Sequence, residues 1–333
     1  MNLLVVSKGG VERGFDKYVI EKFKLEKQSI LKVEVKNYPD STKLVNLINS
    51  LITKNITSIY AIGGGSVLDI SKVLSVFLQS ESKISTNDLK NLNKQIENFN
   101  KIPLIVFPTT SGTGAEVTQF ATIWDKVSNE KFSIDHPLLI PNQYYLDGEL
   151  LEHLTFNNFL VPALDCMSHI FESIWNINRT EESLKYSTDA LNKISQELIN
   201  FSSEKFININ FDVMLQASNL AGKAINITRT SIAHAISYIY TLNFGVPHGL
   251  ACSFTLPKIH DYIYNDFKDS KYIEIIDNFP NIINFLQTFN FKEHMDFYTK
   301  GELINLIPED LNITRSSTFL TQLDKKLISK FNS

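Results

Sequence analysis

The 333-residue chain has little cysteine, no excess of either charge and no long apolar run. Its two cysteines, Cys166 and Cys252, cannot form a disulfide framework and do not form a CxxC pair, so we expect a reducing compartment. A net charge of −4 gives no electrostatic footprint for nucleic acid. No stretch approaches the roughly 18 apolar residues of a membrane helix, and the N-terminus lacks a signal-peptide pattern. We therefore expect a cytoplasmic globular protein without a membrane or nucleic-acid partner.

Short β-branched runs alternate with amphipathic ones in the first half. Such alternation predicts a parallel sheet with ligands bound beyond the carboxyl ends of its strands. Residues 79–101 are polar and predict an exposed helix and loop. Ser41 is expected to cap the second helix. The expected strands are residues 3–7, 32–36, 58–62 and 103–107, and the expected helices are residues 13–28, 41–54 and 66–79.

The pattern changes after about residue 150, where long stretches with helical periodicity replace the strand-like runs. We place the boundary in "YYLDGEL", residues 144–150. The prediction is an α/β nucleotide-binding domain over residues 1–150 and an all-helical catalytic domain over residues 151–333. A cleft between two such domains is the expected ligand site.

Two polar loops follow expected strands. In "YAIGGGSVLDISK" three glycines precede a helix expected to begin near Ser66, where free backbone amides and the helix dipole suit a phosphate. The run is neither a GxGxxG fingerprint nor a Walker loop, and a tight turn also explains it. The second loop, "FPTTSGTGAEVT", suits a ribose or a phosphate, or is an ordinary surface turn. Both loops at one sheet edge favour a nucleotide, with hydroxyls from Thr109, Thr110, Ser111 and Thr113.

Four residues of the second half have metal-binding side chains. "LDCMSHIFE" puts Asp165 and His169 four apart, on one face of a helix, although such pairs also form ordinary solvated contacts. His234 lies in an apolar helix-like run, and His248 lies in a Pro-His-Gly turn. One carboxylate and three imidazoles suit Fe²⁺ or Zn²⁺. Such a centre, with one open position, polarises a carbonyl or stabilises an alkoxide.

These motifs are ordered and spaced as in one known family. "GGGSVLDISK", "PTTSGTGAEVT", "LDCMSHIFES" and "AHAISY…GVPHGLACSFTLP" resemble the iron-containing (group III) alcohol dehydrogenases from residue 60 to residue 257. The resemblance implies the dehydroquinate synthase-like fold, in which an α/β NAD(P)-binding domain precedes a helical metal-binding domain. It implies metal ligation by Asp165, His169, His234 and His248. It implies NAD(P)H binding by Gly63, Gly64, Gly65, Ser66, Asp69, Thr109, Thr110, Ser111 and Thr113.

Within the family, "AGKAINITRTSIAHAISY" looks most like the phosphonoacetaldehyde reductases. The implied reaction is reduction of phosphonoacetaldehyde to 2-hydroxyethylphosphonate. A phosphonate needs cations and hydroxyls near the metal. We expect Thr230 one helical turn from His234. Charge would come from Lys223 and Arg229, unless both are solvent-exposed helix residues, and hydrogen bonds from Asn226, Thr230 and Ser231.

Two positions depart from the family pattern. Tyr238 stands where many members have a histidine of the proton relay, so we expect its hydroxyl to donate the proton. Lys8 follows the first strand, where NAD-preferring relatives often have an acidic residue. A lysine there favours the 2′-phosphate of NADPH, unless it is a simple surface residue. The chain also begins almost at this strand, without the family's preceding hairpin, and we expect exposed sheet surface there.

Three alternatives stay open. The first is a family member that acts on a simple aldehyde or alcohol. The second is a dehydroquinate-synthase-like cyclase, whose Glu-His-His metal set differs from Asp165, His169 and the two later histidines. The third is a relic that binds a metal or a nucleotide without catalysis. The expected partner is a small aldehyde or alcohol, a phosphonate in the preferred case, and the expected assembly is a homodimer.

Overall fold

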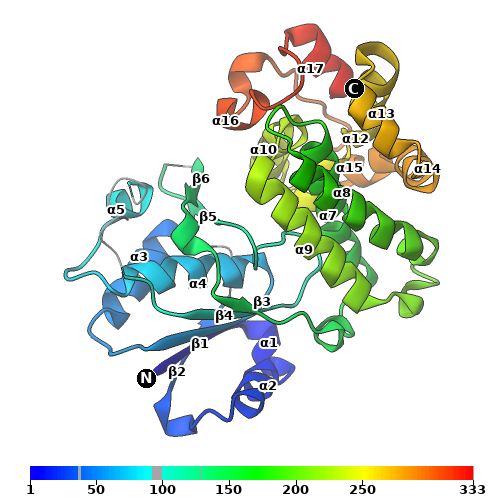
Figure 1. The fold of residues 1–333 in the computed structure, drawn as a ribbon. Coiled ribbons are helices and arrows are strands. Elements are labelled where there is room, and N and C mark those ends of the chain that lie inside the picture. Colours follow the sequence, from blue (N-terminus) through cyan, green and yellow to red (C-terminus); the bar gives the residue numbers. More distant parts are fainter. Residues whose placement is uncertain (37–38, 92–99, 129, 333) are drawn as a thin grey trace. The chain divides into compact units, whose positions relative to one another are not determined.

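The computed structural model describes residues 1–36, 39–91, 100–128 and 130–332 (Figure 1). The chain divides into two compact units. The first comprises Met1–Thr110 and Ala115–Leu151, and the second comprises Ser111–Gly114 and Glu152–Ser333. The polar loop over residues 107–118 therefore contributes to both units, because its central four residues belong with the second.

A five-stranded parallel sheet is the centre of the first unit, and the predicted parallel sheet is confirmed. The three inner strands are apolar and almost entirely buried, as expected for strands covered on both faces. The strand order is β2-β1-β3-β4-β7. The strands are β1 (Asn2–Ser7), β2 (Ile30–Val35), β3 (Ser58–Gly63), β4 (Leu104–Pro108) and β7 (Gln143–Tyr144).

The helices of the first unit correct two predictions. The helix expected over residues 13–28 is shorter and spans only Phe15–Lys22. A separate helix that was not predicted begins at Lys8, directly after β1, and Gly14, with a φ of 79°, separates the two. Asp40, rather than Ser41, caps the third helix by accepting the backbone N–H of Lys43. The helices are α1 (Lys8–Glu12), α2 (Phe15–Lys22), α3 (Ser41–Leu51), α4 (Gly65–Phe77) and α5 (Thr86–Lys90), with short 3-10 helices at Lys27–Ser29, Pro137–Leu139 and Gly148–Leu151.

An antiparallel pair of strands in the first unit was not predicted. β5 (Phe120–Asp125) pairs with β6 (Glu130–Asp135). Buried and half-buried residues alternate along β5, which is typical of a strand covered on one face. The expected exposed helix over residues 79–101 is represented by α5; residues 92–99 lie outside the described ranges.

The second unit is helical, as predicted. Among its described residues we find no strand, only an isolated bridge between Asn176 and Phe319. No helix of the described chain has the length and apolarity needed to cross a bilayer. The helices are α7 (Phe156–Ile174), α8 (Glu181–Glu197), α9 (Phe211–Thr228), α10 (Ile232–Phe244), α11 (His248–Ser253), α12 (Leu256–Asp261), α13 (Ser270–Ile276), α14 (Pro280–Thr288), α15 (Phe291–Thr299), α16 (Ile313–Ser316) and α17 (Lys325–Phe331); short 3-10 helices occupy Leu198–Asn200, Phe206–Asn208 and Pro308–Asp310, and a π-helix occupies Tyr262–Phe267.

The central helix of this unit is α7. It packs against α8, α9, α10 and α11, so every residue from Ala163 to Ile174 is buried. Acidic side chains and histidines are rarely buried without a partner or a metal ion. Asp165, His169 and Glu172 nevertheless lie in this buried stretch, which marks it as the place to look for a site.

Candidate metal centre

The structure brings the four expected metal ligands together in the second unit. Asp165 and His169 come from α7, His234 from α10 and His248 from the start of α11. Oδ1 of Asp165 lies 3.7 Å from Nε2 of His169 and 3.6 Å from Nε2 of His234. The rings of His169 and His234 stack with centroids 4.9 Å apart, and the His248 ring lies 5.2 Å from that of His234.

Gly249 lets α11 approach α7 closely. A Cβ at this position would lie 1.9 Å from the carbonyl oxygen of Val161 and 3.1 Å from Cβ of Asp165. Only glycine therefore fits without displacing one of the helices. The contact sets the neighbouring residue, His248, beside Asp165. His248 is the first residue of α11, with Pro247 as the N-cap, so the predicted turn is wrong and is instead a helix start.

A second carboxylate, Glu172, fixes the orientation of His234. Its Oε2 lies 2.6 Å from Nδ1 of His234, and its Oε1 accepts the His234 backbone N–H at 3.0 Å. With Nδ1 engaged, Nε2 of His234 is left facing Asp165. Sequence reasoning missed Glu172, although its position three residues after His169 puts it near the same face of α7.

The charges in the cluster suit a divalent cation. Burial lowers the pKa of His169 to about 4 despite the nearby Asp165, so its ring is neutral near pH 7. Burial opposes ionisation of Asp165, but the surrounding histidines hold its pKa well below the usual range. Burial also lowers the pKa of His234, but Cys252, Glu172 and Asp165 together raise it well above its ordinary value. A cation at this point would take over the role of that extra proton.

Two buried atoms of the cluster, Oδ1 of Asp165 and Nδ1 of His169, lack a hydrogen-bond partner within the described ranges. Oδ1 of Asp165 is buried and accepts no hydrogen bond there. An ionised buried carboxylate oxygen is costly unless it is paired or bound to a metal. The side-chain atoms beside this oxygen are the Nε2 atoms of His169 and His234, and a metal ion can be bound by such nitrogens together with the carboxylate. The donor set present therefore fits Fe²⁺ or Zn²⁺.

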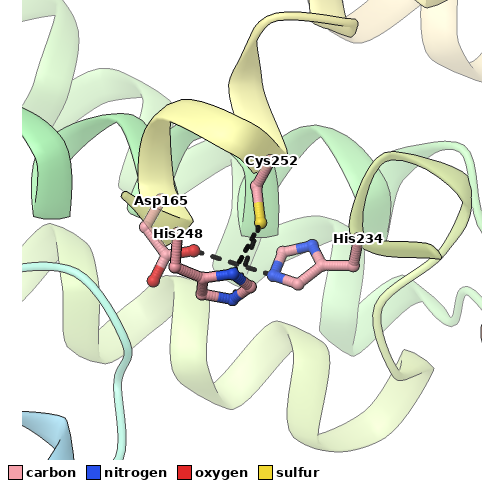
Figure 2. Close-up of side chains that lie close together, drawn as sticks. All are labelled: Asp165, His234, His248 and Cys252. Carbon is pink, nitrogen blue, oxygen red and sulfur yellow. Dashed lines mark hydrogen bonds and ion pairs between the residues drawn. The ribbon is translucent and has the colours of Figure 1, made fainter. Parts of the chain in front are cut away.

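Cys252 also belongs to this group and was missed from the sequence. Its Sγ and one donor atom each from Asp165, His234 and His248 all lie within 4.8 Å of one another (Figure 2). Figure 2 shows the four side chains directed toward one another. The signal was present, because Cys252 follows His248 by four residues and thus shares its helix face.

Tyr238 and Arg315 extend the cluster. The Tyr238 ring is nearly parallel to that of His248, with centroids 6.2 Å apart. The guanidinium carbon of Arg315, on α16, lies 5.1 Å from the Tyr238 ring centroid. Within the described part of the chain, no carboxylate forms an ion pair with Arg315. Sequence reasoning missed this arginine because nothing in its local pattern links it to α10.

The expected substrate residues lie along α9 and the turn after it. The Lys223 ammonium lies 5.8 Å from the Tyr186 ring, and Lys223 and Arg229 are both half-buried. Arg229 ends α9 with φ 69° and ψ 171°, a strained conformation for a non-glycine residue. Its Nη1 donates to the Asn226 carbonyl at 3.3 Å.

The two hydroxyls after Arg229 are buried. Neither Thr230 nor Ser231 has a side-chain hydrogen-bond partner among the described residues. The predicted one-turn relation between Thr230 and His234 is wrong, because α10 begins only at Ile232 and Thr230 precedes it. The Thr318 hydroxyl donates to the Thr230 carbonyl at 3.2 Å and anchors this turn to the segment that carries Arg315.

The glycine-rich loop lies in the first unit, where β3 meets α4. A Cβ on Gly63 would lie 2.5 Å from Cγ2 of Val67, so α4 must start close to the strand. Gly64 is the N-cap of α4, and its added Cβ would lie 3.3 Å from Thr110. α4 begins at Gly65, so the amides of Gly65 and Ser66 are in its first turn.

The other expected cofactor residues have these surroundings. Asp69 accepts the Thr122 N–H at 3.0 Å and lies 3.9 Å from the Lys72 ammonium; burial raises its pKa. Thr109 donates its backbone N–H to the Gly63 carbonyl at 3.0 Å. Lys8 is exposed and lies 4.0 Å from Glu12. In the second unit, the Ser111 hydroxyl is buried and has no hydrogen-bond partner in the described ranges, and Thr113 lies in the same loop.

The chain is similar in sequence and in fold to several known oxidoreductases. The phosphonoacetaldehyde reductase of Streptomyces viridochromogenes is 31% identical over 209 residues, which are 61% of this chain and 52% of the reductase. The sulfoacetaldehyde reductase of Bilophila wadsworthia is 32% identical over 204 residues, 60% of this chain and 50% of that protein. The chain thus spans about half the length of these curated relatives. The crystal structure of sulfoacetaldehyde reductase from Bifidobacterium kashiwanohense in complex with NAD⁺ has a TM-score of 0.76 at 19% identity, covering 99% of this chain and 89% of that one.

Two family models match consecutive parts of the chain. The model described as iron-containing alcohol dehydrogenase matches residues 1–148. The model described as Fe-containing alcohol dehydrogenase family, C-terminal, matches residues 160–294 and includes all four expected metal ligands. Together they account for most of the sequence, and the chain belongs to the iron-containing alcohol dehydrogenase family.

Proposed function

We propose that the protein is a metal-dependent NAD(P)H oxidoreductase that interconverts an aldehyde and a primary alcohol. The observation that carries this proposal is the buried Asp165 carboxylate, which has the His169 and His234 rings beside its Oδ1 and a His248 ring nitrogen within 4.8 Å of one of its oxygens. When bound, the metal supplies Lewis acidity toward the carbonyl oxygen, and the dinucleotide supplies the hydride. The residues that would hold Fe²⁺, with Zn²⁺ as the alternative, are Asp165, His169, His234 and His248.

The chain's own residues orient the site and manage the proton. Glu172 fixes His234 so that Nε2 faces the Asp165 carboxylate. The Tyr238 hydroxyl, on a half-buried ring beside His248, donates the proton that the product alcohol needs. Tyr238 is thus the proposed catalytic residue, with water as the alternative donor.

The dinucleotide would bind at the carboxyl end of β3. Gly63 and Gly64 allow close backbone approach, and the first turn of α4 offers amides and a partial positive charge to the pyrophosphate. The exposed ammonium of Lys8 would bind a 2′-phosphate, which favours NADPH over NADH. The remaining proposed contacts are Gly65, Ser66, Asp69, Thr109, Thr110, Ser111 and Thr113.

We propose an aldehyde with an anionic group as the substrate, with phosphonoacetaldehyde as the first choice. Two of the relatives have names that specify such aldehydes, a phosphonate and a sulfonate. Arg315 adds a guanidinium beside Tyr238, and Lys223 and Arg229 are half-buried rather than fully exposed. The hydrogen-bonding groups of Asn226, Thr230 and Ser231 would complete the pocket.

The test is an oxidation assay with the Fe²⁺- or Zn²⁺-loaded protein. NADPH and NADH consumption is followed with phosphonoacetaldehyde, sulfoacetaldehyde and propanal. Faster turnover of the anionic aldehydes supports the proposal, and turnover of propanal alone favours a simple alcohol dehydrogenase. Phosphate release from a sugar-acid phosphate would favour a cyclase instead. No dinucleotide oxidation with any aldehyde would favour a relic binding protein.

The proposal also includes the location of the protein and its assembly. A cytoplasmic location is proposed because Cys166 and Cys252 form no disulfide bond in the described chain. A homodimer is the proposed assembly, and light scattering during gel filtration measures it directly.

A further inference from the structure

The thiol of Cys252 lies beside the ring of His248. Its Sγ is 3.5 Å from Nδ1 and 3.6 Å from Nε2 of His248. One donor atom each from Asp165, His234, His248 and Cys252 can be chosen so that all four atoms lie within 4.8 Å of one another. Bonds of about 2.0 to 2.3 Å place two ligands of one ion at most about 4.6 Å apart. The distances between these donor atoms are therefore close to those between the ligands of a single metal ion.

The surroundings of Cys252 are not those of a packing residue. A structural cysteine behaves as a small apolar side chain and lies among apolar neighbours. Cys252 is fully buried, yet its sulfur faces two imidazoles and a carboxylate (Figure 2). Oδ1 of Asp165, a residue only 4% exposed, accepts no hydrogen bond in the described ranges and lies 3.6 Å from Nε2 of His234, which is a second indication of a cation there.

The backbone of α11 explains how the sulfur reaches this position. His248 and Cys252 are one helical turn apart and share a face. Gly249 presses the start of this short helix against Val161 and Asp165 of α7. Both side chains of that face are therefore held against the metal-binding stretch of α7.

We propose that Cys252 binds the metal through its thiolate, as a fifth ligand beside Asp165, His169, His234 and His248. This inference rests on the proposed function for the location of the metal. On binding, the thiol releases its proton to solvent and a metal–sulfur bond forms, with no change in oxidation state. One carboxylate and one thiolate balance the charge of a divalent ion. A soft sulfur ligand would favour Zn²⁺ and Co²⁺ over Mg²⁺ and Mn²⁺.

Cobalt substitution of the full chain tests this inference without measuring catalysis. A thiolate bound to Co²⁺ produces a charge-transfer band in the near ultraviolet. Nitrogen and oxygen ligands do not produce this band. The described chain has two cysteines, so Cys166→Ala is the matched control: Cys166 is equally buried but packs in the apolar core of the second unit. The test variants are Cys252→Ala and Cys252→Ser, the second retaining a polar side chain of similar size in case the first does not fold.

The wild type and Cys166→Ala should both show the charge-transfer band. Both Cys252 variants should lose the charge-transfer band but retain the visible bands of bound Co²⁺. Their affinity for Co²⁺ should fall about tenfold or more, because removal of even an outer-shell partner lowers metal affinity by that much. Bound Co²⁺ without the band in the wild type, or a band that survives in Cys252→Ser, would overturn the role of Cys252 and leave the four-residue site intact. Failure of the wild type to bind Co²⁺ would overturn the metal site of the proposed function as well.

Discussion

Glu172 on α7 holds His234 on α10 through two contacts, one to the ring nitrogen Nδ1 at 2.6 Å and one to the backbone N–H at 3.0 Å. Because both side chains are buried, water does not compete for either contact. The second ring nitrogen is thereby directed at Asp165, 3.6 Å away. The relationship links the backbone at the start of α10 to the ligand geometry of the site.

Glu172→Gln should weaken metal binding about 10- to 100-fold, because a neutral amide neither polarises nor orients the imidazole as a carboxylate does. Competition with a chromophoric chelator measures the affinity. Glu197→Gln is the control, since Glu197 is another buried carboxylate of the second unit, which accepts the Asn210 N–H at 3.0 Å. Unchanged metal affinity in Glu172→Gln would contradict the assigned role.

His248→Ala should abolish stoichiometric metal binding and activity while the first unit still binds dinucleotide. The reason is that His248 supplies one of the few donors directed at Asp165 and His234. Metal content per chain is measured by elemental analysis, and dinucleotide binding by fluorescence quenching. His294→Ala removes an exposed histidine that stacks on Phe289 and should leave both unchanged. A full complement of metal in His248→Ala would count against the ligand assignment.

Gly249→Ala should separate α11 from α7, since its methyl group would lie 1.9 Å from the Val161 carbonyl oxygen. We expect a loss of about 1 to 3 kcal/mol in the free energy of unfolding, as for other overpacked sites, and weaker metal binding because His248 moves with the helix. Urea unfolding and metal titration check the two effects. In the control, Gly9→Ala, the added methyl meets only the mobile end of Arg13 at 3.0 Å. Equal stability of the two variants would refute the close-approach argument.

Arg315→Met should raise the KM for phosphonoacetaldehyde by tenfold or more while changing the KM for propanal little, a loss of about 1.4 kcal/mol of binding. The guanidinium on Tyr238 has no carboxylate partner in the described ranges and is the expected contact of the anionic group. Arg229→Ala, compared on the same two aldehydes, shows whether the strained residue at the end of α9 contributes as well. If each variant changes the KM for both aldehydes by the same factor, neither arginine binds the anionic group of the substrate.

Lys72→Met should change how stability depends on pH. Burial lowers the pKa of Lys72 from 10.5 to about 8, while its ammonium donates to the Thr118 hydroxyl and the Phe120 carbonyl. Between pH 8 and 10.5 the unfolded chain binds more protons at this lysine than the folded chain does. The free energy of unfolding therefore rises with pH in this window, by about 3 kcal/mol from this group.

Urea unfolding at several pH values should show that rise in the wild type and a smaller one in Lys72→Met. Lys17→Met, at an exposed position, should behave as the wild type. Parallel pH profiles for the wild type and Lys72→Met would mean that Lys72 is not held with a lowered pKa.

Local patterns predicted much of the fold. Apolar runs such as residues 3–7 and 58–62 became β1 and β3 because a strand that is buried on both faces requires apolar residues along most of its length. Capping was harder to predict. Aspartate and serine are both good N-cap residues, so the sequence does not decide between Asp40 and Ser41, and the structure has Asp40 in this role. The β5–β6 pair was missed although β5 alternates buried and half-buried residues.

The sequence by itself determined the donor types of the site and their order along the chain, because a helix turn brings Asp165 and His169 together whatever surrounds them. The tertiary structure alone decided which other side chains join them. Glu172 meets His234 only because α10 packs on α7, Cys252 turns inward only because Gly249 lets α11 touch α7, and Arg315 reaches Tyr238 only because α16 packs on α10. Contacts between distant segments depend on how helix surfaces fit, and no local periodicity encodes that fit.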